Sequence, residues 1–177
     1  MTLADKIVAL HESLSGKQIP HAFGGAIALA YCTLDPRGTS DIDLNIFVPA
    51  STPEVALAAL PSEVVDRDNK LGNLPRDGQV RLWWGEHPVD LFFDYVALHE
   101  QASKNSRMVP FSGTHIPVLG PIELATFKAM FDRTRDWADL EAMVEAGSVQ
   151  ISKVVELVAG LAGPNDPRVG RLAGLVG

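Results

Sequence analysis

The sequence predicts a mixed α/β fold of the α+β type, in which a small mixed sheet is flanked by helices and followed by a short C-terminal helical region. Strand and helix patterns alternate in the first part of the chain, whereas helical patterns dominate after residue 119. The length of 177 residues suits one compact domain with a helical appendage. Hydrophobic residues make up 46% and charged residues 21%, as in chains that bury a core. We therefore expect a core over residues 1–118 and a C-terminal helical region over residues 119–177, packed on that core.

The first half of the chain shows turn and capping residues between short apolar segments. We expect a helix capped by Thr2 and ending at Gly16, a strand over 19–23 that runs into Gly24-Gly25, a buried helix over 26–34, a loop over 35–40, a strand over 41–48, and a short helix capped by Thr52 that ends near Leu60. Residues 64–79 show no clear pattern.

The second half begins with a predicted β-hairpin and then becomes helical. The expected elements are strands over 80–84 and 89–96 joined by the turn 85–88, a helix near 98–106, extended segments around Val109 and Ile116, and helices over 121–131, over 134–146 and beyond residue 151. Gly120-Pro121 is typical of a helix start, and Gly147 of a helix end.

The formal net charge is −7, which argues against a long nucleic-acid binding surface because such a surface needs many basic residues. A local basic pocket for one triphosphate or one RNA end stays compatible with this charge. The single cysteine, Cys32, lies in an apolar run, so we expect it to be buried and no internal disulfide to form. No secretory signal and no membrane-spanning segment is evident, so we expect a cytoplasmic protein.

The segment Asp41-Ile-Asp43-Leu places two carboxylates on one strand. Side chains at i and i+2 point to the same face, so Asp41 and Asp43 should project together while Ile42 and Leu44 face the core. Adjacent carboxylates repel each other unless a cation lies between them. Mg²⁺ prefers oxygen ligands together with substrate phosphates, which makes it the expected cofactor, with Mn²⁺ as the alternative metal.

A third carboxylate and a glycine pair complete the predicted site. Asp90 interrupts an apolar strand, where an unpaired charge would be costly, and a neighbouring strand bearing Asp41 and Asp43 would explain it. Asp94 lies on the same face but nearer the strand end, so we select Asp90. Gly24-Gly25 lies where a strand meets a helix N-terminus, a position at which backbone N–H groups bind phosphate.

Taken together, Gly24-Gly25, the segment Thr39-Ser40-Asp41-Ile-Asp43 and the later Asp90 resemble the signature of the nucleotidyltransferase superfamily, which has a polymerase β-like fold. The run Arg133-Thr-Arg135-Asp136-Trp-Ala-Asp139 and the preceding Lys128 resemble a motif of AbiE-type (AbiEii) toxin nucleotidyltransferases. Arg135 stands where that motif has lysine, and Gly25 where many members of the superfamily have serine. The chain is also shorter than typical toxins of that branch.

This resemblance implies a role for each matched residue. Asp41, Asp43 and Asp90 would be catalytic and hold the metals, and Asp90 would also help activate the acceptor hydroxyl. Gly24, Gly25, Ser40, Arg37 and Lys128 would bind the nucleotide, with Lys128 also catalytic. Asp136 and Asp139 would orient Lys128 or the acceptor. The alternative for Arg133, Arg135, Asp136 and Asp139 is a solvated ion-pair face on a helix.

The implied activity is transfer of a nucleoside monophosphate from an NTP to a hydroxyl group by two-metal chemistry. The acceptor stays open among an RNA or tRNA end, a protein hydroxyl and a small molecule such as an aminoglycoside or lincosamide antibiotic. A toxin-like member could also have an antitoxin partner, and a homodimer is a further alternative. The competing hypothesis is a non-catalytic module that senses a nucleotide or binds a partner on the same fold.

Overall fold

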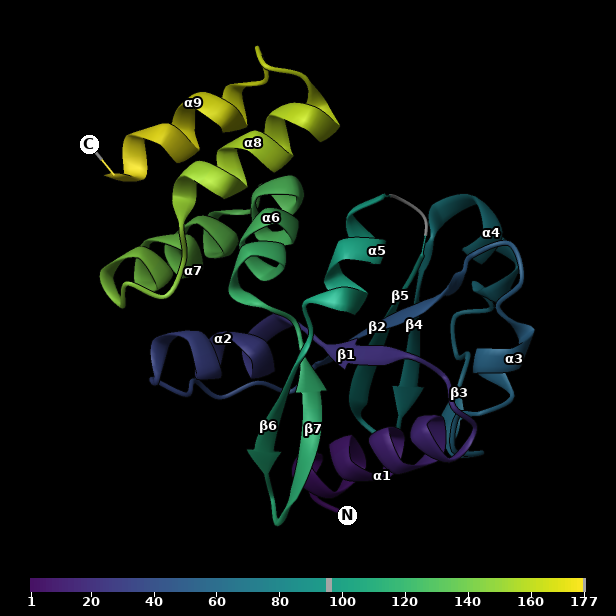
Figure 1. Cartoon of the computed structure of the whole chain (residues 1–177). Coiled ribbons are helices and arrows are strands. Elements are labelled where there is room, and N and C mark those ends of the chain that lie inside the picture. The colour runs from purple at the N-terminus through teal and green to yellow at the C-terminus, as the bar shows by residue number, and fades with distance from the viewer. Residues whose placement is uncertain (95–96, 177) are drawn as a thin grey trace. The chain divides into compact units, whose positions relative to one another are not determined.

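The computed structural model describes residues 1–94 and 97–176 (Figure 1). The chain forms two compact units, a sheet unit of Met1–Ile27 with Gly38–Leu119, and a helical unit of Ala28–Arg37 with Gly120–Gly177. The expected division into domains at residues 118 and 119 stays a prediction.

The sheet unit is built on a mixed sheet, which confirms the predicted fold class. In the described residues the sheet has seven strands, in the order β3 (Val64–Val65), β4 (Gln79–Trp84), β5 (His87–Asp94), β2 (Ile42–Pro49), β1 (His21–Phe23), β7 (Thr114–Val118) and β6 (Arg107–Phe111). The pairs β2/β5 and β1/β7 are parallel, and the other neighbours are antiparallel. Asp43 lies on β2 and Asp90 on the adjacent β5, and Asp41 immediately precedes β2.

Helices of different lengths accompany this sheet. They are α1 (Leu3–Gly16), α3 (Glu54–Leu57), the 3₁₀ turn η1 (Leu71–Asn73), α4 (Leu74–Asp77) and α5 (Ala97–Lys104), while α2 (Gly25–Thr33) begins in this unit. Thr2 caps α1 as expected: its hydroxyl accepts from the Asp5 N–H at 3.2 Å, and the Asp5 carboxylate accepts from the Thr2 N–H at 2.8 Å. This reciprocal pair satisfies two backbone donors that the first helical turn leaves free.

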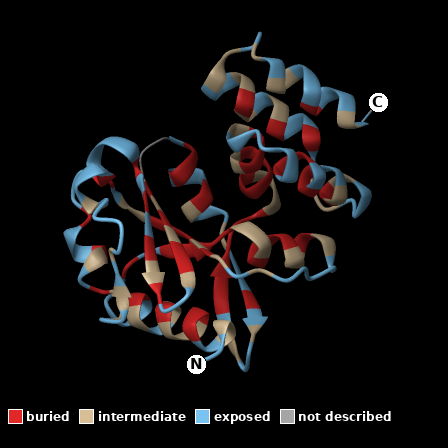
Figure 2. Ribbon diagram, turned by 180° about the vertical axis from the view of Figure 1, so that it is seen from behind, coloured by how far each residue is buried: buried red, intermediate tan, exposed pale blue. Residues whose placement is uncertain are grey.

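The core of the sheet unit follows the alternation of β2. Ile42, Leu44 and Ile46 are fully buried, and the apolar face of α1 contributes Ile7 and Leu10 to the same core. Figure 2 shows buried residues gathered along the central strands of this unit. Because successive strand side chains alternate, burial of the even-numbered residues turns Asp41 and Asp43 to the opposite face.

The helical unit contains α6 (Pro121–Phe131), α7 (Thr134–Glu145), α8 (Ile151–Ala162), α9 (Pro167–Ala173) and the turn η2 (Gly174–Val176). Trp137 is buried there, and its indole N–H donates to Oδ1 of Asp132 at 2.6 Å. The guanidinium of Arg171 lies 3.9 Å from the Trp137 ring centroid, within the range of a cation–π contact. Cys32 is buried, as expected.

Two local predictions were wrong. The hairpin turn is the two-residue Gly85-Glu86, shorter than the expected 85–88, because Gly85 adopts a φ of +59° and lets β5 begin at His87. Thr52 does not cap α3: Pro53 is at the N-cap position, the helix begins at Glu54 without a side-chain cap, and Thr52 lies in the preceding turn, where its N–H donates to the Pro49 carbonyl.

The stretch 64–79, for which no element was predicted, contains β3, η1 and α4. The expected strand end at residues 95–96 lies outside the described residues. Within the described part of the chain, no helix is long and apolar enough to cross a membrane.

Candidate active site

The predicted carboxylates meet on the central strands of the sheet unit. Asp43 on β2 lies directly opposite Asp90 on β5 in the parallel register of these two strands. Asp41 precedes β2 by one residue and shares the face of Asp43. All three side chains are half-buried, so they are open to solvent on one side. The expectation that a strand bearing the aspartate pair lies beside Asp90 is confirmed.

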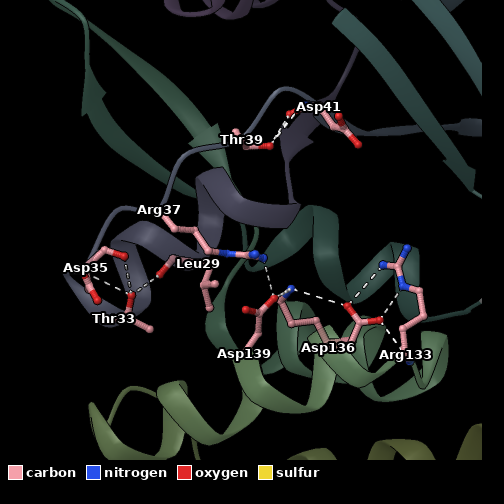
Figure 3. A network of polar contacts seen from close by, with 10 residues as sticks. Leu29, Thr33, Asp35, Arg37, Thr39, Asp41, Arg133, Asp136 and Asp139 are labelled. Carbon is pink, nitrogen blue, oxygen red and sulfur yellow. Dashed lines mark hydrogen bonds and ion pairs between the residues drawn. The ribbon is translucent and has the colours of Figure 1, made fainter.

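Neighbouring polar groups hold Asp41 at the start of β2. The hydroxyl of Ser40 donates to Oδ1 of Asp41 at 2.7 Å, and the Thr39 hydroxyl oxygen accepts from the Asp41 N–H at 3.2 Å. Figure 3 shows Thr39 beside Asp41 at this bend. Nδ1 of His87 lies 3.0 Å from the carbonyl oxygen of Ser40, which ties the loop to the first residue of β5. The hydroxyl of Ser40, predicted to bind phosphate, therefore bonds to a carboxylate in this structure.

A basic residue that the sequence analysis did not select, Arg81 on β4, binds this cluster. Its Nε and Nη2 each donate to one oxygen of Asp90 at 2.7 Å, and Nη2 lies 3.7 Å from Oδ2 of Asp41. The hydrogen bonds to Asp90 raise the pKa of Arg81, and the charges of Asp41 and Asp43 add to this effect. The sequence feature that could have identified Arg81 is the hairpin turn. With a two-residue Gly85-Glu86 turn, the strand register places Arg81 opposite Asp90.

The glycine pair closes the other side of the cluster. Gly25 has a φ of +50°, and a Cβ on it would stand 1.8 Å from Oδ2 of Asp43. A Cβ on Gly24 would stand 3.0 Å from the side-chain nitrogen of Asn45, and the Gly24 N–H donates to the Asp43 carbonyl at 2.9 Å. The turn into α2 thus lies directly against the Asp43 carboxylate, which requires glycine at position 25.

The donor chemistry of this cluster suits Mg²⁺. Asp41, Asp43 and Asp90 offer carboxylate oxygens, the ligands that Mg²⁺ prefers. Within the residues that the structure describes, no group of three acidic, histidine or cysteine side chains is already assembled for a metal. Mg²⁺ is usually held by one or two carboxylates together with substrate phosphates, so a preassembled cage is not required. The arrangement fits a metal that binds together with a nucleotide.

The helical unit contains a second cluster, formed around Lys128. Nζ of Lys128, a buried residue, lies 2.6 Å from Oδ2 of Asp139, and the same oxygen accepts from Nη2 of Arg37 at 2.8 Å. Asp136 Oδ1 lies 3.8 Å from Lys128 Nζ. Figure 3 shows Arg37 and Asp139 pointing toward each other, with Asp136 alongside. The residues predicted to bind nucleotide from this unit are therefore held by Asp139.

Asp136 lies in the first turn of α7 and also faces Lys128. Its Oδ2 accepts from the Arg133 Nε at 2.7 Å and from the Arg133 N–H at 3.3 Å, which caps the helix. Asp136 and Asp139 are both buried, so they do not form the solvated ion-pair face that was the alternative interpretation. The role of these two carboxylates in orienting Lys128 or the acceptor stays a prediction, with Asp139 at 2.6 Å and Asp136 at 3.8 Å from Lys128 Nζ.

Comparison with known proteins supports the fold. No protein-family model and no curated protein matches the chain. The chain is similar to the solution structure of the antibiotic-resistance factor ANT(2'')-Ia, with 16% identity, 98% of this chain and 94% of that chain covered, and a TM-score of 0.63. It is also similar to an antigenic nucleotidyltransferase-like protein from Paracoccidioides brasiliensis, with 15% identity, 98% and 86% coverage, and a TM-score of 0.54.

At these identities the likeness shows the fold alone, a mixed sheet flanked by helices as in the nucleotidyltransferase-like protein. The predicted resemblance to AbiE-type toxins is not confirmed by these neighbours and stays a prediction.

Proposed function

We propose that this protein is a nucleotidyltransferase that moves a nucleoside monophosphate from an NTP to a hydroxyl group of an acceptor. The observation that supports this most is the register of Asp43 opposite Asp90 on parallel strands, with Asp41 on the same face. The glycine turn against Asp43 adds a backbone surface that can approach a triphosphate. The likeness in fold to a nucleotidyltransferase-like protein points in the same direction.

In the proposed reaction, the acceptor oxygen forms a bond to the α-phosphorus while the bond from that phosphorus to the β-phosphate bridging oxygen breaks. Pyrophosphate leaves, and Asp90 accepts the proton of the acceptor hydroxyl. Asp41, Asp43 and Asp90 would hold Mg²⁺, or Mn²⁺ in its place. The bound metal supplies neutralisation of the charge that develops on the attacking and leaving oxygens. The remaining contribution of the chain is to position the phosphates and the acceptor in line.

The supporting residues have distinct tasks in this scheme. The backbone at the Gly24-Gly25 turn would approach the β- and γ-phosphates, with the Ser40 hydroxyl released from Asp41 to join it. Lys128 and Arg37 would neutralise triphosphate charge, held in position by Asp139. Buried and tightly paired, Lys128 is better placed as a fixed charge than as a mobile proton carrier.

The experiment that tests this function is calorimetric titration with each of the four NTPs, with and without Mg²⁺. Asp43→Asn and Asp90→Asn are the test variants, and Asp94→Asn is the matched control because Asp94 lies on the same strand and face as Asp90. We expect magnesium-dependent binding in wild type and Asp94→Asn that disappears in the two test variants. Binding that survives in both test variants would contradict the proposed site.

The acceptor can be found with α-³²P-labelled NTP and three separate acceptor pools: RNA, protein, and a panel of cationic antibiotics. The small-molecule pool is included because the chain is similar in fold to a solved antibiotic-resistance factor over 94% of that protein's length. Label transferred to one pool, and lost in Asp43→Asn, identifies the acceptor class. If nucleotide binds but no pool is labelled, the non-catalytic nucleotide-sensing module becomes the better interpretation.

A further inference from the structure

Arg81 binds carboxylates that the proposed function assigns to the metal. Its guanidinium binds both oxygens of Asp90 at 2.7 Å and lies 3.7 Å from Asp41, so it contacts two of the three proposed metal ligands. The fork geometry of guanidinium matches a carboxylate, and bidentate pairs of this kind are among the stronger ionic contacts. While the pair is intact, each oxygen of Asp90 accepts a hydrogen bond from Arg81, so a metal or an acceptor proton has to compete with the guanidinium for this carboxylate.

The same contact can be released. The Arg81 side chain is 43% exposed, compared with 19% for that of Asp90, so the guanidinium can turn to solvent without opening the core. Because the guanidinium is partly exposed, water can solvate it when the pair breaks, which lowers the cost of separating this bidentate contact. Asp41, Asp43 and Asp90 share this face and all act on Arg81, so the guanidinium offsets their mutual repulsion when no metal is bound.

We propose, resting on the proposed function, that Arg81 is an internal counter-cation that competes with the divalent metal for Asp90 and Asp41. Arg81 dissociates from these carboxylates when the metal binds together with a nucleotide, because the guanidinium can then bind the triphosphate instead. Arg81 is thus a positioning residue that couples metal binding to nucleotide binding.

The physical basis is linkage between two binding events. A metal alone has to displace a bidentate guanidinium and leave it without a partner, which weakens its binding. A metal with a nucleotide brings phosphate oxygens, which guanidinium binds bidentately as well as it binds carboxylate. The metal and the nucleotide therefore bind more tightly together than either does alone, and this coupling is reciprocal.

The test measures Mn²⁺ binding without nucleotide by electron paramagnetic resonance, and Mg-ATP binding by calorimetry, on the same proteins. Arg81→Gln removes the charge while keeping a similar length, and Arg76→Gln is the control because Arg76 is an exposed arginine paired with its neighbour Asp77. We expect Arg81→Gln to bind Mn²⁺ alone roughly 3- to 10-fold more tightly than wild type. The same variant should bind Mg-ATP more weakly than wild type. Arg76→Gln should change neither, and Arg81→Lys should bind Mn²⁺ more like wild type because it keeps the charge.

Equal or weaker Mn²⁺ binding by Arg81→Gln, with a circular dichroism spectrum like that of wild type, would overturn the proposal. Unmeasurable Mn²⁺ binding by both wild type and Arg81→Gln would overturn it as well, because the variant is expected to bind. Either of these two outcomes would overturn only the role of Arg81. The proposed function would still be supported if wild type binds Mg-NTP and Asp43→Asn does not. If Asp43→Asn and Asp90→Asn both bind Mg-NTP as wild type does, the proposed function fails whatever Arg81→Gln shows.

Discussion

Gly25 makes room for the carboxylate of Asp43 by having no side chain, since a Cβ at that position would stand 1.8 Å from Oδ2. Its φ of +50° also lies in the left-handed region that L-residues rarely adopt. The turn into α2 and the proposed metal ligand on β2 therefore depend on each other.

Gly25→Ala should consequently disturb both the fold and the site. The left-handed backbone alone costs about 1–2 kcal/mol for a residue with a Cβ, and displacement of the carboxylate adds to this. We expect a lower free energy of unfolding in urea and loss of magnesium-dependent nucleotide binding. Gly38→Ala is the control, because nothing lies within 4 Å of a Cβ there. If Gly25→Ala binds the nucleotide as tightly as wild type does, the Asp43 carboxylate can shift away from the added Cβ and the prediction is wrong.

Asp43→Asn should separate stability from function. The substitution removes one of three negative charges on the face that Arg81 neutralises, which relieves repulsion. We expect the free energy of unfolding to stay within about 0.5 kcal/mol of wild type or to rise, although nucleotide binding is lost. Any gain should shrink in high salt because screening weakens the repulsion. A large loss of stability would instead indicate that Asp43 is a structural residue.

Asp139→Ala should destabilise the helical unit strongly. Removal of this carboxylate leaves Lys128 buried without the partner it contacts at 2.6 Å. Breaking a buried ion pair from one side typically costs about 3–5 kcal/mol. Asp77→Ala is the control for a carboxylate in an exposed pair, and its effect should be below about 1 kcal/mol in urea unfolding.

The double variant Lys128→Met/Asp139→Leu tests the reason for that loss. Replacing both partners by apolar residues removes the uncompensated charge, so stability should recover relative to Asp139→Ala. Nucleotide binding should nevertheless stay weak, because the fixed positive charge of Lys128 is gone. Equal stability of the single and double variants would argue that the buried charge is not what destabilises the protein.

The histidine pair His11 and His21 should make the sheet unit less stable in mild acid. Nε2 of His21 lies 3.0 Å from Nδ1 of His11, and Nδ1 of His21 lies 2.7 Å from the carbonyl oxygen of Ile19. A carbonyl can only accept, so His21 carries its proton on Nδ1 and its Nε2 accepts from His11. A second proton on His21 would disrupt this contact.

Burial lowers the pKa of His21 and also that of His11. The folded protein therefore favours neutral rings, whereas the unfolded chain takes up protons near pH 6.5. The stability from this effect is present above about pH 6.5 and is lost as the pH falls toward the lowered folded pKa values. Thermal unfolding at pH 7.5 and 5.5 should show a larger drop for wild type than for His11→Gln/His21→Gln, and equal drops would contradict this assignment.

Much of the sheet unit could be predicted from local patterns. Alternation along residues 41–48 placed Asp41 and Asp43 on one face, and the Thr2 cap and the hairpin strands followed from short-range signals. These features depend on neighbours in sequence, where backbone geometry and side-chain period suffice. The fold class followed for the same reason, since it reflects the order of such elements.

The contacts that give the site its character were decided by tertiary structure. The parallel pairing that sets Asp43 opposite Asp90 joins strands far apart in the chain, and a turn two residues shorter than expected brought Arg81 onto Asp90. The charges at positions 136 and 139 have the spacing of a solvated helix face, yet packing of α7 buried them around Lys128. Spacing along one element determines which side chains share a face, but what that face meets, and whether water reaches it, depends on how the whole chain packs.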